Sequence, residues 1–223
     1  MNLITYPDRQ ALVLALAQQL GQELAQHLRT NERISFCVPG GTSPAPVFDA
    51  LSALDLDWSR VTVLLGDERW VAEDHPRSNA ALLRRHLLRS KAAAARLLPL
   101  YTGAATPDEA APGLSELVDT LLPLNVSLLG MGEDMHTASL FPGAEGLAEA
   151  LAADAPAVLP IHGGGATEPR ISLTARVLAS TLNGHLLIYG AAKRKALERA
   201  ASLPPEQAPI RAVMRDLTVH WAE

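Results

Sequence analysis

The chain has 223 residues, enough for one large domain or two small ones, and it can bury a core without needing disulfides. Hydrophobic residues make up 48% of the chain and charged residues 19%, which excludes disordered and fibrous classes. The formal net charge of -5 argues against nucleic acid or an anionic membrane as the main partner, since both require extended basic surface. We expect a single domain over residues 1–223.

The cysteine content and the N-terminal segment bear on the compartment. Cys37 is the one cysteine, so no intrachain disulfide can form and nothing requires an oxidising environment. The first eight residues lack a basic segment that leads into an apolar run, and no uncharged run is long enough to span a bilayer. We therefore expect a cytoplasmic protein without a membrane partner. We also expect a monomer or a small homo-oligomer.

The N-terminal part predicts a helix and two buried strands. Asp8 can cap a helix in which leucines recur every four residues from position 12 to 28, giving one apolar stripe. Residues 34–38 and 61–65 are apolar runs without alternation, which is typical of strands that crossover helices bury on both faces.

A glycine loop follows the first of these strands. Gly40, Gly41 and Thr42 lead to Ser43, which is expected to cap a helix from Pro44 to Leu54. Unpaired backbone N–H groups and the positive end of a helix dipole converge at such a loop and can bind an anion. The loop fits neither Walker A nor Gly-x-Gly-x-x-Gly, so nucleotide binding is not indicated. A lone Gly-Gly pair is about as often a plain turn.

A charged segment follows the second strand. Asp67, Glu68 and Arg69 leave its carboxyl end, which in a parallel sheet lies near the glycine loop. A guanidinium offers a planar fork of donors that suits phosphate. Composition alone favours a solvated charged turn, and a helix is expected after it at residues 78–88.

The middle of the chain is less informative. Residues 92–95 favour a helix and residues 97–100 a short strand. Pro112 and Gly113 are expected to interrupt or precede a helix that ends near Leu122.

A strand and a polar cluster then come together. Val126 to Leu129 predicts a strand, and the Gly-x-Gly turn after it leads to Asp134 and His136. Ligands bind at the carboxyl ends of strands in open α/β sheets, so His136 is a better catalytic candidate than a histidine on a helix face. A histidine in an ordinary environment, with a pKa of about 6.5, suits a general base. Asp134 is expected to orient the ring, to cap a helix beginning near Thr137, or both.

The C-terminal part continues the alternation. Gly163 to Gly165 predict a flexible loop that could close over a site, although a triple glycine is as often a plain connection. Gly190 turns a strand into a helix that carries Lys193. The expected elements are a helix at 146–153, buried strands at 157–161 and 185–189, and an edge strand at 219–221. Strands alternating with helices predict an α/β fold with a mostly parallel sheet between two helical layers, a Rossmann-like three-layer sandwich.

Three blocks in one order resemble the 6-phosphogluconolactonases, relatives of the glucosamine-6-phosphate deaminases. These blocks are Pro39-Gly40-Gly41-Thr42-Ser43-Pro44, then Leu65-Gly66-Asp67-Glu68-Arg69-Trp70-Val71 with Ser78-Asn79 downstream, then Gly130-Met131-Gly132-Glu133-Asp134-Met135-His136-Thr137-Ala138-Ser139-Leu140-Phe141-Pro142-Gly143. The resemblance implies a fold of the NagB/RpiA/CoA transferase-like type. It implies a hydrolase without a cofactor that opens 6-phospho-D-glucono-1,5-lactone to 6-phospho-D-gluconate in the oxidative pentose phosphate pathway.

The resemblance also implies roles for single residues. His136 corresponds to the general base, and Asp134 lies beside it in the motif. The expected substrate contacts are Gly40, Gly41, Thr42, Asp67, Arg69, Arg170 and Lys193. The chain departs from the family at Met135, where glycine is usual, so that either Met135 is strained at a positive φ or the loop differs.

Other functions fit the sequence less well. A glucosamine-6-phosphate deaminase is expected to carry Asp-Glu-Tyr and Asn-Gly-His, where this chain has Arg69 and Asp134-Met135-His136. A non-catalytic sugar-phosphate-sensing domain should bring a DNA-binding helix pair, and none is readable. Ser139 lies in no Gly-x-Ser-x-Gly elbow, which argues against a serine hydrolase. No His-Glu-x-x-His or similar cluster indicates a metal.

Overall fold

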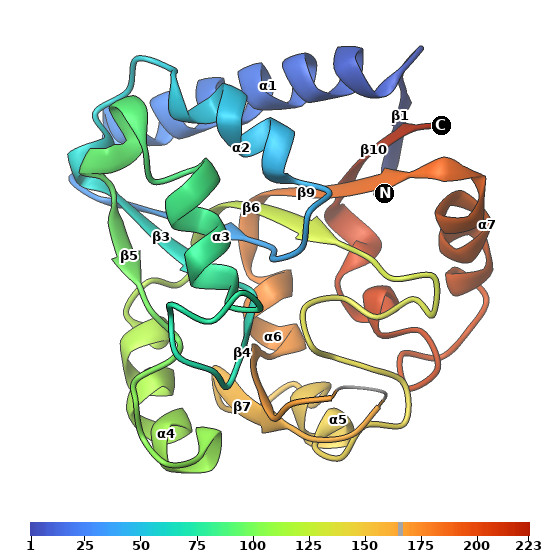
Figure 1. Ribbon diagram of the computed structural model, residues 1–223. Coiled ribbons are helices and arrows are strands. Elements are labelled where there is room, and N and C mark those ends of the chain that lie inside the picture. The colour runs from blue at the N-terminus through green and yellow to red at the C-terminus, as the bar shows by residue number, and fades with distance from the viewer. Residues whose placement is uncertain (165–166) are drawn as a thin grey trace.

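The structure, a computed structural model, describes residues 1–164 and 167–223 (Figure 1). Its main sheet consists of β1 (Asn2–Thr5), β2 (Ile34–Val38), β3 (Val61–Leu65), β5 (Arg96–Leu98), β6 (Leu124–Gly130), β9 (Thr181–Tyr189) and β10 (Thr218–Ala222). The seven strands lie in the order β1-β10-β9-β6-β2-β3-β5. Every neighbouring pair is parallel, so the carboxyl ends of all strands meet at one edge. The predicted α/β fold is confirmed.

Helices cover both faces of this sheet (Figure 1). In that view α1 (Arg9–Thr30) and α2 (Ala45–Ser52) lie above it, and α6 (Ala175–Ala179) and α7 (Gly190–Ala200) lie below. Helix α3 (Asn79–His86) packs against α2. Asp8 caps α1 as predicted, since its Oδ1 accepts from the Ala11 N–H at 2.8 Å. The leucines of α1 that recur every four residues are buried in the core.

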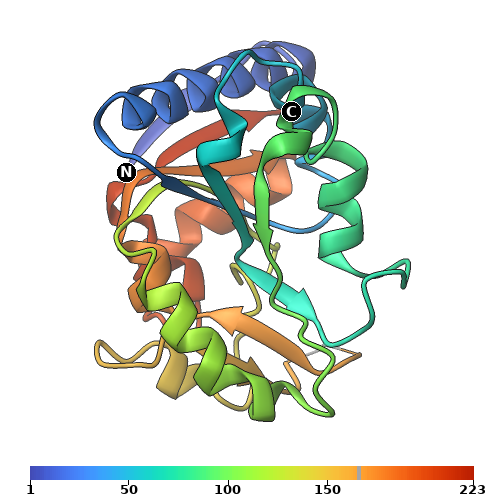
Figure 2. The same cartoon turned by 90° about the vertical axis from the view of Figure 1, so that its left-hand side faces the viewer.

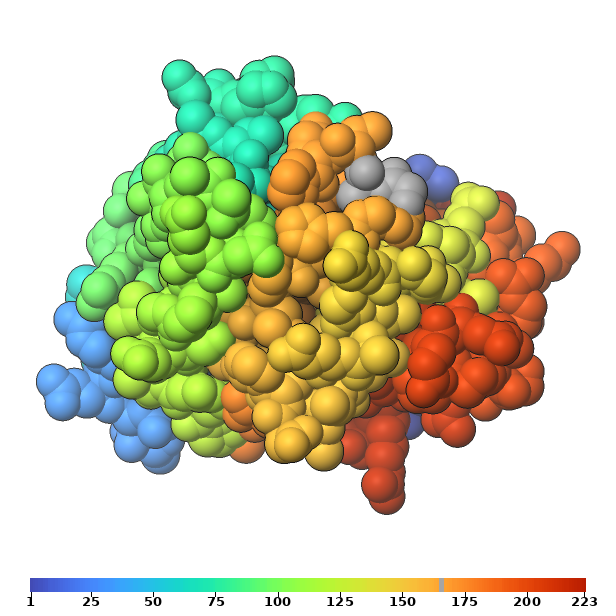
Figure 3. Space-filling model, turned by 90° about the horizontal axis from the view of Figure 1, so that it is seen from below, coloured from blue at the N-terminus to red at the C-terminus, as the bar shows by residue number. Residues whose placement is uncertain are grey.

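A second sheet lies beneath the first (Figure 2). Its strands β4 (Asp67–Arg69), β8 (Arg170–Leu173) and β7 (Val158–Ile161) are antiparallel in that order. Helices α4 (Pro107–Asp119) and α5 (Leu147–Ala150) lie beside it, and they cover much of the face seen from below in Figure 3.

The small sheet corrects the expectation of a solvated charged turn after β3. Backbone bonds extend the pairing at both ends of β4, from the Leu173 N–H to the Gly66 carbonyl at 2.8 Å and from the Trp70 N–H to the Pro169 carbonyl at 2.9 Å. Asp67 and Glu68 are therefore drawn into the protein, where their carboxylates have hydrogen-bond partners.

Three further expectations were wrong. Ser43 does not cap α2, which begins at Ala45 and ends before Leu54. Pro112 lies inside the continuous α4, which Thr106 caps and whose apolar face packs into the core. The strand at the C-terminal end is not an edge strand, because the N-terminal β1 pairs along its outer side.

The connections contain short helices, and one hydrophobic core joins the elements. The remaining short helices are η1 (Trp58–Arg60), η2 (Ser90–Ala94), η3 (Pro209–Ala212) and η4 (Met214–Asp216). Buried side chains from both ends of the chain pack into one apolar cluster built mainly of aliphatic residues. The single domain over residues 1–223 stays a prediction. In the described part of the chain, no helix is both long and apolar enough to cross a membrane. Of the predicted glycine loop, Gly165 lies outside the described residues.

Candidate active site

A cavity of about 220 Å³ opens where β2, β3, β6 and β9 end. Seven of the residues that the sequence predicts for the site line this cavity, namely Gly40, Gly41, Asp67, Arg69, His136, Arg170 and Lys193. Two expected residues do not line it. Thr42 borders a neighbouring hollow with Arg9 and Tyr189. Asp134 is not among the residues that line the cavity, and its carboxylate contacts the His136 ring.

His136 is held by its neighbouring acid. Its Nδ1 lies 2.5 Å from Asp134 Oδ1, which also accepts from the His136 backbone N–H at 3.2 Å. An ionised carboxylate only accepts hydrogen bonds, so Nδ1 carries the proton of a neutral ring and Nε2 is the basic nitrogen. No helix begins near Thr137, so of the two roles expected for Asp134 the geometry has ring orientation and not helix capping.

The loop that carries His136 has two strained residues. Met135 and Ala138 have φ angles of 67° and 49°, in the left-handed region that disfavours side chains. Met135 therefore keeps the backbone conformation that a glycine would allow. Its buried side chain and a bond from the Ile210 N–H to its carbonyl at 3.0 Å hold it there. A Cβ at Gly132 would overlap the His136 ring, which explains the glycine at that position.

The glycine loop approaches α3 closely. A Cβ at Gly40 would overlap the side-chain amide of Asn79, so only glycine fits there. Asn79 also lines the cavity and donates from Nδ2 to the Asp67 carbonyl at 3.0 Å. No role was predicted for Asn79. The one signal in the sequence was its place in the block that resembles the family.

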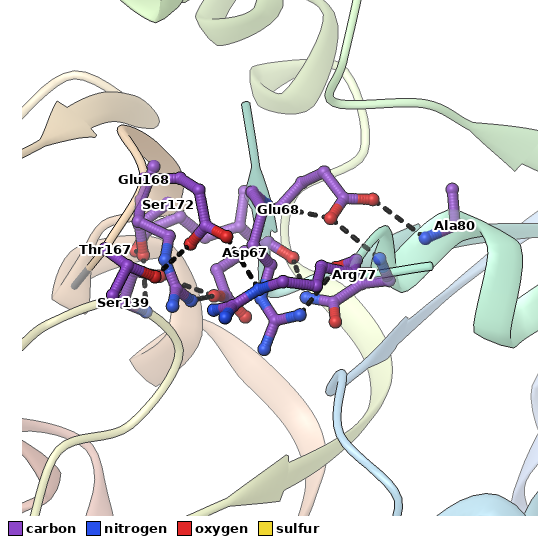
Figure 4. A network of polar contacts seen from close by, with 12 residues as sticks. Asp67, Glu68, Arg77, Ala80, Ser139, Thr167, Glu168 and Ser172 are labelled. Atoms are coloured by element: carbon purple, nitrogen blue, oxygen red, sulfur yellow. Dashed lines mark hydrogen bonds and ion pairs between the residues drawn. The ribbon is translucent and has the colours of Figure 1, made fainter. Parts of the chain in front are cut away.

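Glu68 belongs to the scaffold rather than to the cavity wall (Figure 4). Its carboxylate accepts from the backbone N–H groups of Asn79 and Ala80, each at 2.8 Å, and from the Ser78 hydroxyl at 3.1 Å. It thereby caps the N-terminus of α3. Burial raises the pKa of the Glu68 carboxyl, and the backbone donors oppose that rise.

The cavity wall carries more positive than negative charge. Arg69, Arg170 and Lys193 face it, with Asp67 as the acid in the same wall. Asp67 lies 3.6 Å from Arg170 Nη1 and accepts a hydrogen bond from the Ser139 hydroxyl (Figure 4). Ser139 is thus engaged by a buried carboxylate and not by His136. A local pocket for an anion therefore exists in a protein whose overall charge is -5.

The described residues form no group of three or more histidine, cysteine or acidic side chains that could hold a metal ion. Metal independence of the activity stays a prediction.

Comparison with known proteins places the chain among sugar-phosphate enzymes. Residues 7–221 match the family model of glucosamine-6-phosphate isomerases/6-phosphogluconolactonase. A 6-phosphogluconolactonase of Mesorhizobium japonicum is 41% identical, with 99% of this chain and 95% of that protein covered. One of Pseudomonas aeruginosa is 43% identical, with 92% and 88% covered.

Solved structures agree with these sequence relatives. The crystal structure of a 6-phosphogluconolactonase from Shewanella baltica superposes with a TM-score of 0.95 at 30% identity, covering 100% of this chain and 98% of that one. A monomeric glucosamine-6-phosphate deaminase, 17% identical over 100% of this chain and 98% of its own, shares the fold with a TM-score of 0.82. The chain therefore belongs to the glucosamine-6-phosphate isomerase/6-phosphogluconolactonase family.

Proposed function

We propose that this chain hydrolyses 6-phospho-D-glucono-1,5-lactone to 6-phospho-D-gluconate, the reaction of the oxidative pentose phosphate pathway. The observation that carries the proposal is His136, which lines a cavity together with three cationic side chains and whose Nδ1 lies 2.5 Å from Asp134. The curated relatives that match nearly the whole chain are named 6-phosphogluconolactonase. We further propose a cytoplasmic location and a monomeric or small homo-oligomeric state.

His136 acts as a general base on water. Its Nε2 takes a proton while the water oxygen adds to the lactone carbonyl carbon, and the carbonyl oxygen becomes an oxyanion. When that tetrahedral adduct collapses, the bond to the ring oxygen breaks and the proton on Nε2 passes to that oxygen. The sum is one lactone and one water converted to one hydroxy acid. Asp134 keeps the ring in the tautomer that leaves Nε2 free and stabilises the imidazolium between the two steps.

The phosphate is held by groups that follow three strands. Lys193 comes after β9, the glycine loop after β2 and Arg69 after β3, and β6 with the His136 loop lies between β9 and β2. Long cationic side chains from both sides and backbone N–H groups at the start of α2 can then converge on one anion. In this proposal Gly40 and Gly41 allow that approach, because neither presents a Cβ.

The experiment follows the disappearance of the phosphorylated lactone, with spontaneous hydrolysis measured in the same buffer. We expect the purified protein to accelerate the reaction in proportion to its concentration. His136→Ala at the same concentration serves as the matched control, since it removes the base while leaving the fold and the cations. A wild-type protein that is folded and gives only the spontaneous rate would exclude the proposed function.

A further inference from the structure

Arg170 is a buried cation with unused hydrogen-bonding capacity. It lies on β8 opposite Arg69 of β4, and its side chain is 10% exposed. Its nearest acid, Asp67, is 3.6 Å from Nη1, which is longer than a good charge-assisted hydrogen bond. Its buried Nε has no partner among the described residues. Burying a charged donor without an acceptor costs free energy, so this guanidinium is suited to an acceptor that arrives with a ligand.

One aromatic ring links Arg170 to the proposed base. The Phe141 ring lies 4.5 Å from the His136 ring, centroid to centroid, and the Arg170 Cζ lies 5.5 Å from the centre of the same Phe141 ring. A guanidinium against an aromatic face gains from the negative charge of that face. Phe141 therefore fixes the guanidinium relative to the imidazole, and both groups line the same cavity.

We propose that Arg170 is a catalytic residue that stabilises the oxyanion formed on the lactone carbonyl oxygen, with Asp67 and Phe141 as positioning residues. This inference rests on the proposed function. When water adds, the carbonyl π electrons move to the oxygen, which accepts a hydrogen bond from the guanidinium. When the adduct collapses, the electron pair returns and the bond to the ring oxygen breaks. Arg170 keeps its own protons throughout.

The surroundings of Arg170 fit the carbonyl end of the substrate better than its phosphate. The guanidinium already faces the carboxylate of Asp67, which would repel a doubly charged phosphate. A carbonyl oxygen is neutral until the transition state, when a positioned donor in a buried site has its largest effect. Lys193 follows β9, which β6 and β2 separate from the β3 end that carries Asp67, and Lys193 forms no ion pair with an acid among the described residues.

The test compares Arg170→Met with wild type on two substrates, the phosphorylated lactone and unphosphorylated glucono-1,5-lactone. Loss of one oxyanion donor lowers kcat by roughly 10²- to 10³-fold. We expect that loss on both lactones, with KM changed by less than about threefold, because the interaction exists only in the transition state. Loss confined to the phosphorylated lactone, or expressed mainly in KM, would assign Arg170 to the phosphate and overturn the inference.

Chemical rescue separates catalysis from structure. In Arg170→Ala, guanidinium chloride at low, non-denaturing concentration should restore part of kcat, and the same concentration of sodium chloride should not. The double variant Asp67→Asn/Arg170→Met removes both charges of the pair. If it recovers wild-type kcat, Arg170 serves only to neutralise Asp67 and the inference is wrong.

Two controls keep the outcomes distinct. Arg84→Ala removes a guanidinium from an exposed ion pair with Glu73 outside the cavity, so its kcat should stay within about twofold of wild type. Far-UV circular dichroism and Tm establish that each variant is folded. If the wild type itself gives no rate above spontaneous hydrolysis, the proposed function fails and this inference falls with it. If the wild type is active and folded Arg170→Met is equally active, only the inference about Arg170 fails.

Discussion

Among the pairs of a histidine and a carboxylate in this molecule, His136 with Asp134 and His185 with Glu23 lie in different surroundings. His136 Nδ1 meets Asp134 at 2.5 Å beside the cavity, and His185 Nε2 meets Glu23 at 2.7 Å between β9 and α1. The histidine side chains are 30% and 2% exposed, respectively. The distance alone would rank the two pairs as equals. The environment of the other ring nitrogen separates them.

In the buried pair, both ring nitrogens of His185 are hydrogen-bonded. His185 Nδ1 meets His220 Nε2 at 3.0 Å, and His220 Nδ1 meets the Tyr6 hydroxyl at 2.9 Å. With Glu23 as the final acceptor, Tyr6 donates to His220, His220 to His185 and His185 to Glu23, and every ring nitrogen is used. This chain of hydrogen bonds stabilises the packing of β1, β10, β9 and α1. A histidine becomes a base candidate when one nitrogen remains free at a cavity, as at His136.

The largest expected effect tests this difference directly. His136→Ala should lower kcat/KM for the phosphorylated lactone by roughly 10²- to 10⁴-fold, the usual contribution of a general base, with the fold retained. The rate should also fall on the acid side, because a protonated imidazole cannot accept the proton of water. His185→Gln is the matched comparison, and it should lower Tm while folded protein keeps its kcat. Equal loss of kcat in both folded variants would contradict the distinction.

The next effect concerns the cations of the cavity. Charge-assisted hydrogen bonds contribute about 1.5–3 kcal/mol each, so Lys193→Ala or Arg69→Ala should reduce kcat/KM for the phosphorylated lactone roughly 10- to 150-fold. Lys195→Ala on the exposed part of the same helix is the control for Lys193 and should change little.

Unphosphorylated gluconolactone sharpens the assignment. It should be a poor substrate, and Lys193→Ala should affect it much less, because the lost partner is the phosphate. Equal damage by Arg69→Ala to both lactones would move Arg69 from the phosphate to the carbonyl. If Lys193→Ala and Arg69→Ala both leave the preference for the phosphorylated over the unphosphorylated lactone unchanged, neither residue binds the phosphate.

Much of the main sheet could be predicted from the sequence because its strands are short, continuous apolar runs. Residues 34–38 and 61–65 were predicted with the bounds that the structure has. Of the small sheet, the strand predicted at 157–161 corresponds to β7. Strand β4 could not be predicted, because it is a charged tripeptide whose burial depends on partners far along the chain, such as Ser139 and Arg170. Strand pairing of this kind leaves no periodic signal.

The candidate site likewise has residues that the sequence indicates and features that it does not. His136 and the glycines directly follow apolar strands, so their place in the sequence is enough to indicate them. The placement of Thr42 outside the cavity depends on how the turn before α2 is oriented, and a sequence does not encode that by pattern. The buried histidines were missed for a different reason. His185 and His220 lie in apolar strands, and only the register between β9 and β10 shows that they are neighbours.

The buried network predicts a pH dependence of stability. Burial, and next the neighbouring His185, lower the pKa of His220 to about 4 from an ordinary value near 6.5, while Glu23 opposes the shift. Between these values the unfolded chain binds more protons than the folded one, so stability is complete above about pH 6.5 and falls toward pH 4. Moving from pH 7.5 to pH 5 should remove about 2 kcal/mol of unfolding free energy through this group.

Urea unfolding at the two pH values measures the change, and His220→Gln is the control because it removes the titrating group. The variant should be less stable at pH 7.5 and should lose less stability on acidification than wild type does. An equal loss in both proteins would show that His220 does not contribute to the pH dependence.

The smallest effect concerns the backbone strain in the loop that carries His136, which the hydrogen-bonded network of His185 and His220 lacks. Ala138 has a φ of 49° and a small side chain, so Ala138→Gly relieves left-handed strain of about 1–2 kcal/mol and loses part of that gain to the extra entropy of an unfolded glycine. We expect a net stabilisation of about 0.5 kcal/mol in urea unfolding at pH 7.5. Met135→Gly relieves the same kind of strain, yet it should destabilise, because it also removes a buried side chain from the core. If both variants change the free energy of unfolding in the same direction, strain does not dominate at Ala138 and packing at Met135, and the prediction is wrong.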